Sequence, residues 1–190
     1  IAVGFNNIRF DDEFIRHLLW RNFHDPYEWG WKDGRSRWDM LDVVRLTRAL
    51  RPEGINWPLD AKGEPSNRLE LITSANGIAH ENAHDALADV TALIAVTKLI
   101  KQKQPQLYDY LLKMRDKKLI QQLVNVDDKK PFVYASGRYD KEFAKTTVAF
   151  PLTTSRNGGV VVYDLRYDPT PFVGLSVEEL SAKLFASWEE

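Results

Sequence analysis

The sequence predicts a mixed α/β protein in which a helix-rich unit, residues 1–104, precedes a smaller β-rich unit, residues 105–190. A short continuous apolar run at 1–5 fits a buried strand, and the residues after it place apolar side chains at helical spacing. Beyond the boundary, runs of β-branched and aromatic residues replace that periodicity. With 190 residues, 44% of them hydrophobic, the chain can bury one core and part of a second.

Four helices are expected in the first unit. Residues 10–23 repeat apolar side chains at helical spacing behind a cluster of acidic residues, which the positive end of a helix favours. Residues 39–54 form a second helix that a proline stops. The third, 69–77, ends at Gly77, which suits a C-terminal cap, and the fourth covers 78–100.

The second unit is expected to contain basic connecting helices, then three strands and a final helix. The last two strand candidates are separated by "SRNGG", a sequence typical of a hairpin turn. The final helix opens with Ser176 and Glu179 at capping-box spacing. Three strands and a helix are too few for a closed barrel, so the unit is expected to be incomplete. The strand candidates are 131–139, 145–154 and 159–167.

Composition excludes several classes of protein. The chain has no cysteine, which rules out a disulfide framework and thiolate metal ligands, and a reducing cytoplasm is the expected compartment. No apolar run approaches the roughly 18 to 20 residues that span a bilayer. The opening "IAVGFNNIRF" has neither an initiator methionine nor signal-peptide features, so we expect it to be the middle of a longer sequence.

The near-neutral net charge of −1 conceals a basic band at residues 101–130, with 8 Lys and Arg against 4 Asp and Glu. A solvated face of amphipathic helices is the favoured interpretation. The alternative is a surface that follows the phosphates of a nucleic acid.

The entrance of the helix 78–100 is unusually rich in titratable groups. If Asp85 is the N-cap, Asp89 heads the same face as the apolar residues further along, and such a carboxylate needs donors or a cation. A metal ion would satisfy it, and His84 could then serve as the base that deprotonates water. A second His-x4-Asp pair, His80 with Asp85, exists; the phase of the helix favours the first. The alternative is a capped helix start without catalysis.

Asp11 is a second candidate because it follows a strand and its turn and begins a helix, where α/β folds collect active-site groups. Its alternative interpretation is a plain N-cap.

These residues carry a resemblance to a known family. "GFNNIRFDDEF" and "NAHDALADV" resemble the second and third motifs of the DEDD 3′-to-5′ exonucleases, and the His-x4-Asp spacing marks the DEDDh branch. The segments 21–58 and 68–90 strongly resemble the exodeoxyribonuclease I family. The resemblance implies part of a ribonuclease H-like exonuclease domain followed by part of an SH3-like β-rich domain.

The resemblance also implies a reaction. His84 would be the general base, Asp89 a metal ligand and Asp11 a ligand of a second metal, with two Mg²⁺ ions, or Mn²⁺, as cofactors. The substrate would be single-stranded DNA, hydrolysed to nucleoside 5′-monophosphates in DNA repair and recombination. A monomer is expected, with the single-strand DNA-binding protein as a further partner and no membrane. The family's Asp-x-Glu strand has no counterpart, so the chain as given is expected to be inactive.

Aromatic and basic residues interleave in the first hundred positions, a combination that binds single strands without reading sequence. By resemblance, Tyr27, Trp31 and Arg68 are the leading substrate-binding candidates, joined by Arg16 and Arg45. The alternative is that loop tryptophans anchor the loop to the core. Two other functions stay open, a DEDDh exoribonuclease and a non-catalytic single-strand nucleic-acid binding module.

Overall fold

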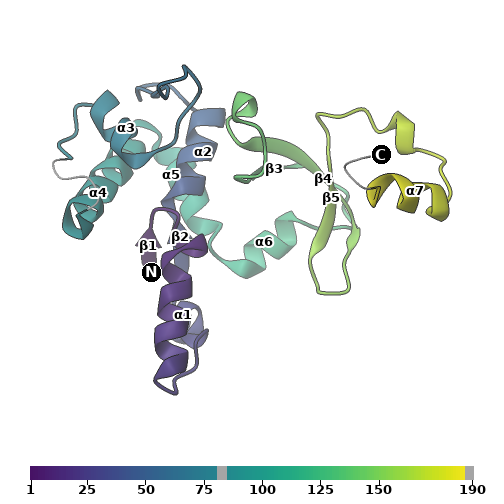
Figure 1. Cartoon of the computed structure of the whole chain (residues 1–190), viewed down its shortest axis with the longest axis horizontal. Helices are drawn as coiled ribbons and strands as arrows, with labels where there is room; N and C mark the ends of the chain where they lie inside the picture. Colours follow the sequence, from purple (N-terminus) through teal and green to yellow (C-terminus); the bar gives the residue numbers. More distant parts are fainter. Residues whose placement is uncertain (81–84, 187–190) are drawn as a thin grey trace.

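The computed structural model describes residues 1–80 and 85–186 (Figure 1). Its first part contains a two-stranded parallel pair, in which Val3 is registered with Trp38, and helices packed around it. The chain passes from the second strand directly into α2, because Asp39 caps that helix by accepting a hydrogen bond from the Leu41 amide. The elements are β1 (Ala2–Gly4), α1 (Asp11–Arg21), β2 (Arg37–Asp39), α2 (Met40–Leu50), α3 (Leu69–Ala75), α4 (Ala86–Lys103) and α5 (Pro105–Lys113).

The hydrophobic core lies where α2, α3, α4 and α5 meet. Each helix contributes the apolar face that its sequence period predicts. Gly77 follows α3 with a φ of 65°, the left-handed conformation expected of a helix-ending glycine. Fully buried members include Met40, Val44, Ile72 and Val96.

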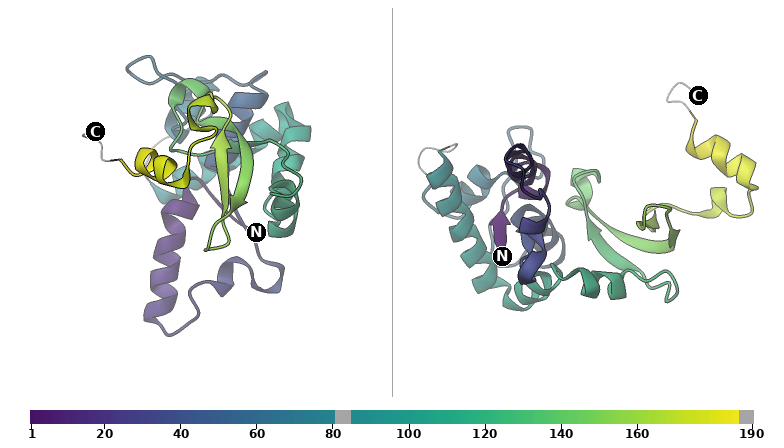
Figure 2. Two further views of the ribbon diagram at one scale, coloured as in Figure 1. Left: turned by 90° about the vertical axis from the view of Figure 1, so that its right-hand side faces the viewer. Right: turned by 90° about the horizontal axis from the view of Figure 1, so that it is seen from below.

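The β-rich part is an antiparallel three-stranded sheet in the order β3-β4-β5, reached through α6 (Figure 2). The predicted hairpin is confirmed: β4 pairs with β5 across residues 155–159. The predicted capping box of the last helix is also confirmed, with Ser176 and Glu179 exchanging hydrogen bonds. These elements are α6 (Lys117–Leu123), β3 (Phe132–Ala135), β4 (Thr146–Thr154), β5 (Val160–Asp164) and α7 (Val177–Leu184).

Two features differ from the prediction. The first strand is not buried, because Ala2 and Val3 are exposed at an edge that no other described strand covers. Helix α1 projects from the other helices, and its apolar side chains Phe14 and Leu18 are each 63% exposed (Figures 1 and 2). Helical spacing therefore predicted the helix correctly but not the burial of its apolar face. Among the described helices, none is long and apolar enough to cross a membrane.

Candidate active site

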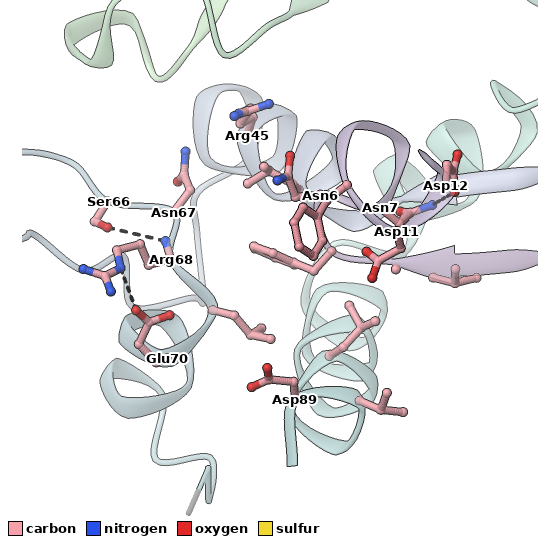
Figure 3. A pocket seen from close by; sticks show the side chains of 18 of the residues that line it. Asn6, Asn7, Asp11, Asp12, Arg45, Ser66, Asn67, Arg68, Glu70 and Asp89 are labelled. Atoms are coloured by element: carbon pink, nitrogen blue, oxygen red, sulfur yellow. Dashed lines mark hydrogen bonds and ion pairs between the residues drawn. The ribbon is translucent and has the colours of Figure 1, made fainter. Parts of the chain in front are cut away.

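A cavity of about 1080 Å³ opens where β1 ends, where α1 and α4 begin, and beside the loop that leads into α3 (Figure 3). Lys141, Ala144 and Lys145 of the β-rich part complete its wall. Lys141 also binds the loop on the opposite side, with Nζ 2.6 Å from Glu64 Oε2 and 3.4 Å from Asp60 Oδ2. Both parts of the chain thus build one cavity.

Two of the predicted carboxylates, Asp11 and Asp89, line this cavity. Figure 3 shows both carboxylates at the same hollow, on separate helices. Asp11 is the first residue of α1, and Phe10 holds the N-cap position, so the interpretation of Asp11 as a plain N-cap is wrong. The location of both acids in the first turn of a helix places each near the positive end of a helix dipole.

The structure confirms the predicted phase of α4, in which Asp85 caps the helix and Asp89 lies on the face of the apolar residues that follow. Asp85 is the N-cap and accepts a hydrogen bond from the Ala88 amide at 3.2 Å. Leu93, Val96 and Ile100 are buried, while the side chain of Asp89, one turn earlier, is 45% exposed and faces the cavity. The predicted general base, His84, lies outside the described residues.

His80 holds Asp89 in a way that the sequence did not reveal. Its Nε2 is 2.8 Å from Asp89 Oδ1, and its Nδ1 is 3.2 Å from Thr73 Oγ1. The carboxylate can only accept, so Nε2 carries the hydrogen of the first bond. The His80 side chain is 6% exposed and Thr73 is fully buried, which makes this a largely dry connection from α3 to the start of α4.

The start of α1 is fixed by a second buried acid. Asp12, 1% exposed, forms an ion pair with Arg37 and accepts a hydrogen bond from the Asn7 side chain. Asp12 belongs to the acidic cluster that the positive end of the helix favours, and these two contacts give it a structural role as well. Asp39 adds to this by accepting the amide hydrogens of residues 6 and 8, and burial raises the pKa of its carboxyl despite those bonds. The backbone before Asp11 is therefore tied to β2.

The donor set at this cavity suits a hard divalent cation, since the exposed candidates are carboxylates. Asp11 and Asp89 are the predicted ligands among the residues described. No three histidine or acidic side chains of that part of the chain lie close enough together to hold a metal. Two carboxylates thus fit a metal in type, but they are fewer than a pair of ions ordinarily shares.

The structure separates the predicted substrate-binding residues into two groups. Arg45 and Arg68 line the cavity. Arg68 pairs with Glu70 at 2.6 Å, and its side chain is 67% exposed. Tyr27 and Trp31 lie outside the cavity wall, 60% and 64% exposed, so they do not anchor their loop in the core.

Arg16 also lies outside the cavity wall, where it forms an ion pair with Glu13 and stacks over Tyr27 at 5.3 Å. The roles of these five residues stay predictions. The sequence missed His80, Lys141 and Lys145 as cavity residues, and a local pattern carries no signal for the two lysines because they come from the other unit.

Comparison with known proteins agrees with this architecture. The exonuclease family model matches residues 1–97, and the exonuclease I SH3-like domain model matches residues 115–190. The chain belongs to the exonuclease family, an enzyme family, and the predicted fold class is confirmed. Within it, the chain is a homologue of exodeoxyribonuclease I. It is 46% identical to that protein of Escherichia coli (strain K12) and 50% identical to that of Haemophilus influenzae. Each match covers 97% of this chain and 39% of the relative.

Solved structures show the same similarity. E. coli exonuclease I in complex with a dA16 oligonucleotide gives a TM-score of 0.91 at 46% identity, over 99% of this chain and 41% of that one. The ExoI/SSB-Ct complex gives 0.89 at 45% identity, over 99% and 41%. The zinc ion bound form of the E. coli ExoI–ssDNA complex gives 0.89 at 46% identity, over 98% and 40%. The chain therefore spans about two fifths of these proteins.

Proposed function

We propose that this chain forms part of a 3′-to-5′ exonuclease that removes nucleoside 5′-monophosphates from single-stranded DNA, in DNA repair and recombination. The observation that carries the proposal is the placement of Asp11 and Asp89 on one cavity, each in the first turn of its own helix. The proposal is supported by the relatives, which are named exodeoxyribonuclease I, and by the E. coli exonuclease I solved in complex with a dA16 oligonucleotide. The division of labour between units, with a boundary at residue 104, is part of the proposal.

The residues divide the work by chemistry. His84 accepts the proton of the attacking water. Asp11 and Asp89 hold divalent cations, Mg²⁺ in the first place because their oxygens are hard ligands. When bound, these ions supply water activation and stabilise the leaving oxygen. Arg45 and Arg68 bind phosphates, while Tyr27, Trp31 and Arg16 offer stacking faces and charge along the strand.

A family-length version of the protein tests this proposal. In that version the 190 residues are joined to the parts of an exodeoxyribonuclease I that they do not match, including its Asp-x-Glu segment. We expect Mg²⁺-dependent release of mononucleotides from the 3′ end of a single-stranded DNA oligonucleotide, and none from the chain alone. Asp89→Asn should abolish release while DNA binding persists. Release by the 190 residues alone would mean that a different carboxylate completes the site.

The same assay separates the alternatives. Faster release from a matched RNA oligonucleotide would identify an exoribonuclease. Binding without release by the family-length version would identify a single-strand binding module. Because an exonuclease I was solved as the ExoI/SSB-Ct complex, the single-strand DNA-binding protein is the partner we propose for the whole protein, which we expect to act as a monomer.

A further inference from the structure

Two arginines from distant segments converge on a glycine of the β-rich part. A Cβ atom added to Gly137 would lie 3.1 Å from Arg45 Nη2 and 3.4 Å from Arg9 Nη1. Arg9 precedes α1, Arg45 lies within α2, and Gly137 follows β3. The absence of a side chain at position 137 therefore leaves room for two guanidinium groups at one point, which we call the arginine cradle.

The charges in the cradle are only partly balanced. Arg45 Nη1 binds Asp42 Oδ1 at 2.7 Å, but Arg45 Nε is buried and has no hydrogen-bond partner in the described part of the chain. Arg9 is exposed and forms no ion pair with any described residue. Both nitrogens lie close to the same Cβ position, so the two guanidinium charges repel each other. An anion between them would remove that repulsion. Both nitrogens are close enough for the oxygens of one phosphate group to contact them, since such bonds are about 2.8 Å long.

The cradle adjoins the candidate active site. Arg9 lies two residues before Asp11, and Arg45 itself lines the cavity. Figure 3 shows the Arg45 side chain on the far side of α2 from Asp89, toward the ribbon of the β-rich part. The Ser136 amide donates to the Lys145 carbonyl oxygen at 2.9 Å, which joins the Gly137 turn to a cavity residue.

We propose that Arg9, Arg45 and Gly137 form a phosphodiester-binding subsite that receives the backbone of single-stranded DNA as it leaves the cavity toward the β-rich part. The inference rests on the proposed function, since it takes the same strand as ligand. It assigns a binding role to Arg9 and a steric role to Gly137. Position 137 does not require glycine for its φ, so glycine there serves the close approach of the two arginines.

The test measures binding of the 190-residue chain to fluorescein-labelled oligothymidylate by anisotropy, in EDTA and over a series of salt concentrations. Each phosphate contact contributes about 0.7 to the logarithmic salt slope for single strands. Arg9→Gln should lower the slope by about 0.7, which is about fivefold in affinity at 0.1 M salt relative to 1 M. Gly137→Ala should lower it by a smaller amount, because a Cβ 3.1 Å from Arg45 Nη2 and 3.4 Å from Arg9 Nη1 shifts the guanidinium groups without removing their charge.

Matched controls separate the cradle from charge and folding effects. Arg156→Gln removes an exposed arginine from the hairpin turn, and Gly159→Ala adds a Cβ whose nearest neighbour is the Ser155 hydroxyl at 3.2 Å. Both should leave the slope unchanged. Thermal unfolding verifies that each variant is folded, and Arg9→Gln decides the question if Gly137→Ala is not. An unchanged slope for Arg9→Gln, or an equal fall for Arg156→Gln, overturns the subsite. If the unaltered chain binds no single strand, the subsite fails, whereas the proposed function is decided separately by nucleotide release from the family-length version.

Discussion

Removal of His80 tests whether the dry connection from Thr73 to Asp89 sets the metal affinity of the active site. The substitution His80→Ala deletes the 2.8 Å hydrogen bond to Asp89 Oδ1. A hydrogen bond to a charged group contributes about 1.5 to 3 kcal/mol, or roughly 10- to 150-fold. Because the Asp89 side chain is 45% exposed, water can replace part of the bond. We therefore expect the lower end, about tenfold weaker divalent-cation binding, within the range usual for partners of metal ligands.

The family-length version is titrated with Mn²⁺, and electron paramagnetic resonance monitors the bound ion. The Mg²⁺ dependence of nucleotide release is measured in parallel. His80→Gln keeps a donor for Asp89 and should recover most of the affinity. His17→Ala removes an exposed histidine of α1 outside the cavity and serves as the control. A merely structural role would lower the melting temperature and leave the Mn²⁺ midpoint in place, and that outcome would refute the reasoning.

A matched threonine pair extends the test to the other end of the connection. Thr73 and Thr47 are both fully buried, and each hydroxyl also bonds a carbonyl oxygen four residues earlier in its helix. Thr73→Val removes the contact to His80 Nδ1 at 3.2 Å, whereas Thr47→Val removes only a helix bond. A weaker metal midpoint is expected for the first variant alone. If both variants have the same Mn²⁺ midpoint, Thr73 does not contribute to metal binding.

Three further outcomes are expected. His84→Ala in the family-length version should slow release by about 10²- to 10⁴-fold with DNA binding retained, measured by single-turnover kinetics. Neutralising three lysines of the basic band together should lower the salt slope of oligonucleotide binding. An unchanged slope would mean that the band is a solvated helix face that does not contact phosphates. The three are Lys113, Lys117 and Lys118. The hydrogen bond from Arg166 lowers the pKa of Asp164 to about 2, so this acid stabilises the fold above its unfolded pKa near 3.8, and that stability is lost as pH falls toward 2. In the variant Asp164→Asn, the free energy of unfolding should fall less over that pH window, by at most about 2 kcal/mol. Circular dichroism measures this unfolding.

Much of the fold could be predicted because helix signals are local. Asp85 as a cap, Ser176 with Glu179 as a capping box and the turn at 155–159 all involve residues within a few positions of one another. The strand β2 could not be predicted, since three residues next to a helix acquire strand character only by pairing with β1. The exposed apolar face of α1 shows the same limit, because periodicity reports which face is apolar and not what covers it.

The candidate site was predictable in part. Helix phase correctly predicted the direction of Asp89, because the apolar residues that follow it in α4 define that direction, and its role as a metal ligand stays a prediction. The bond from His80 to Asp89 was missed, since the chain between them folds back and the nine-residue separation matches no motif. The convergence of Arg9 with Gly137 spans most of the chain, and nothing in either neighbourhood indicates it.

The bridge from Lys141 to Asp60 and Glu64 bears on how this protein can be altered. Because the cavity wall is shared, a loop exchange or a reporter group at 137–145 would change the site as directly as a substitution in α4. The hairpin tip at 155–159 is exposed, lies outside the cavity wall and connects β4 with β5. A fluorophore or an affinity tag can therefore be attached there without altering the cavity wall.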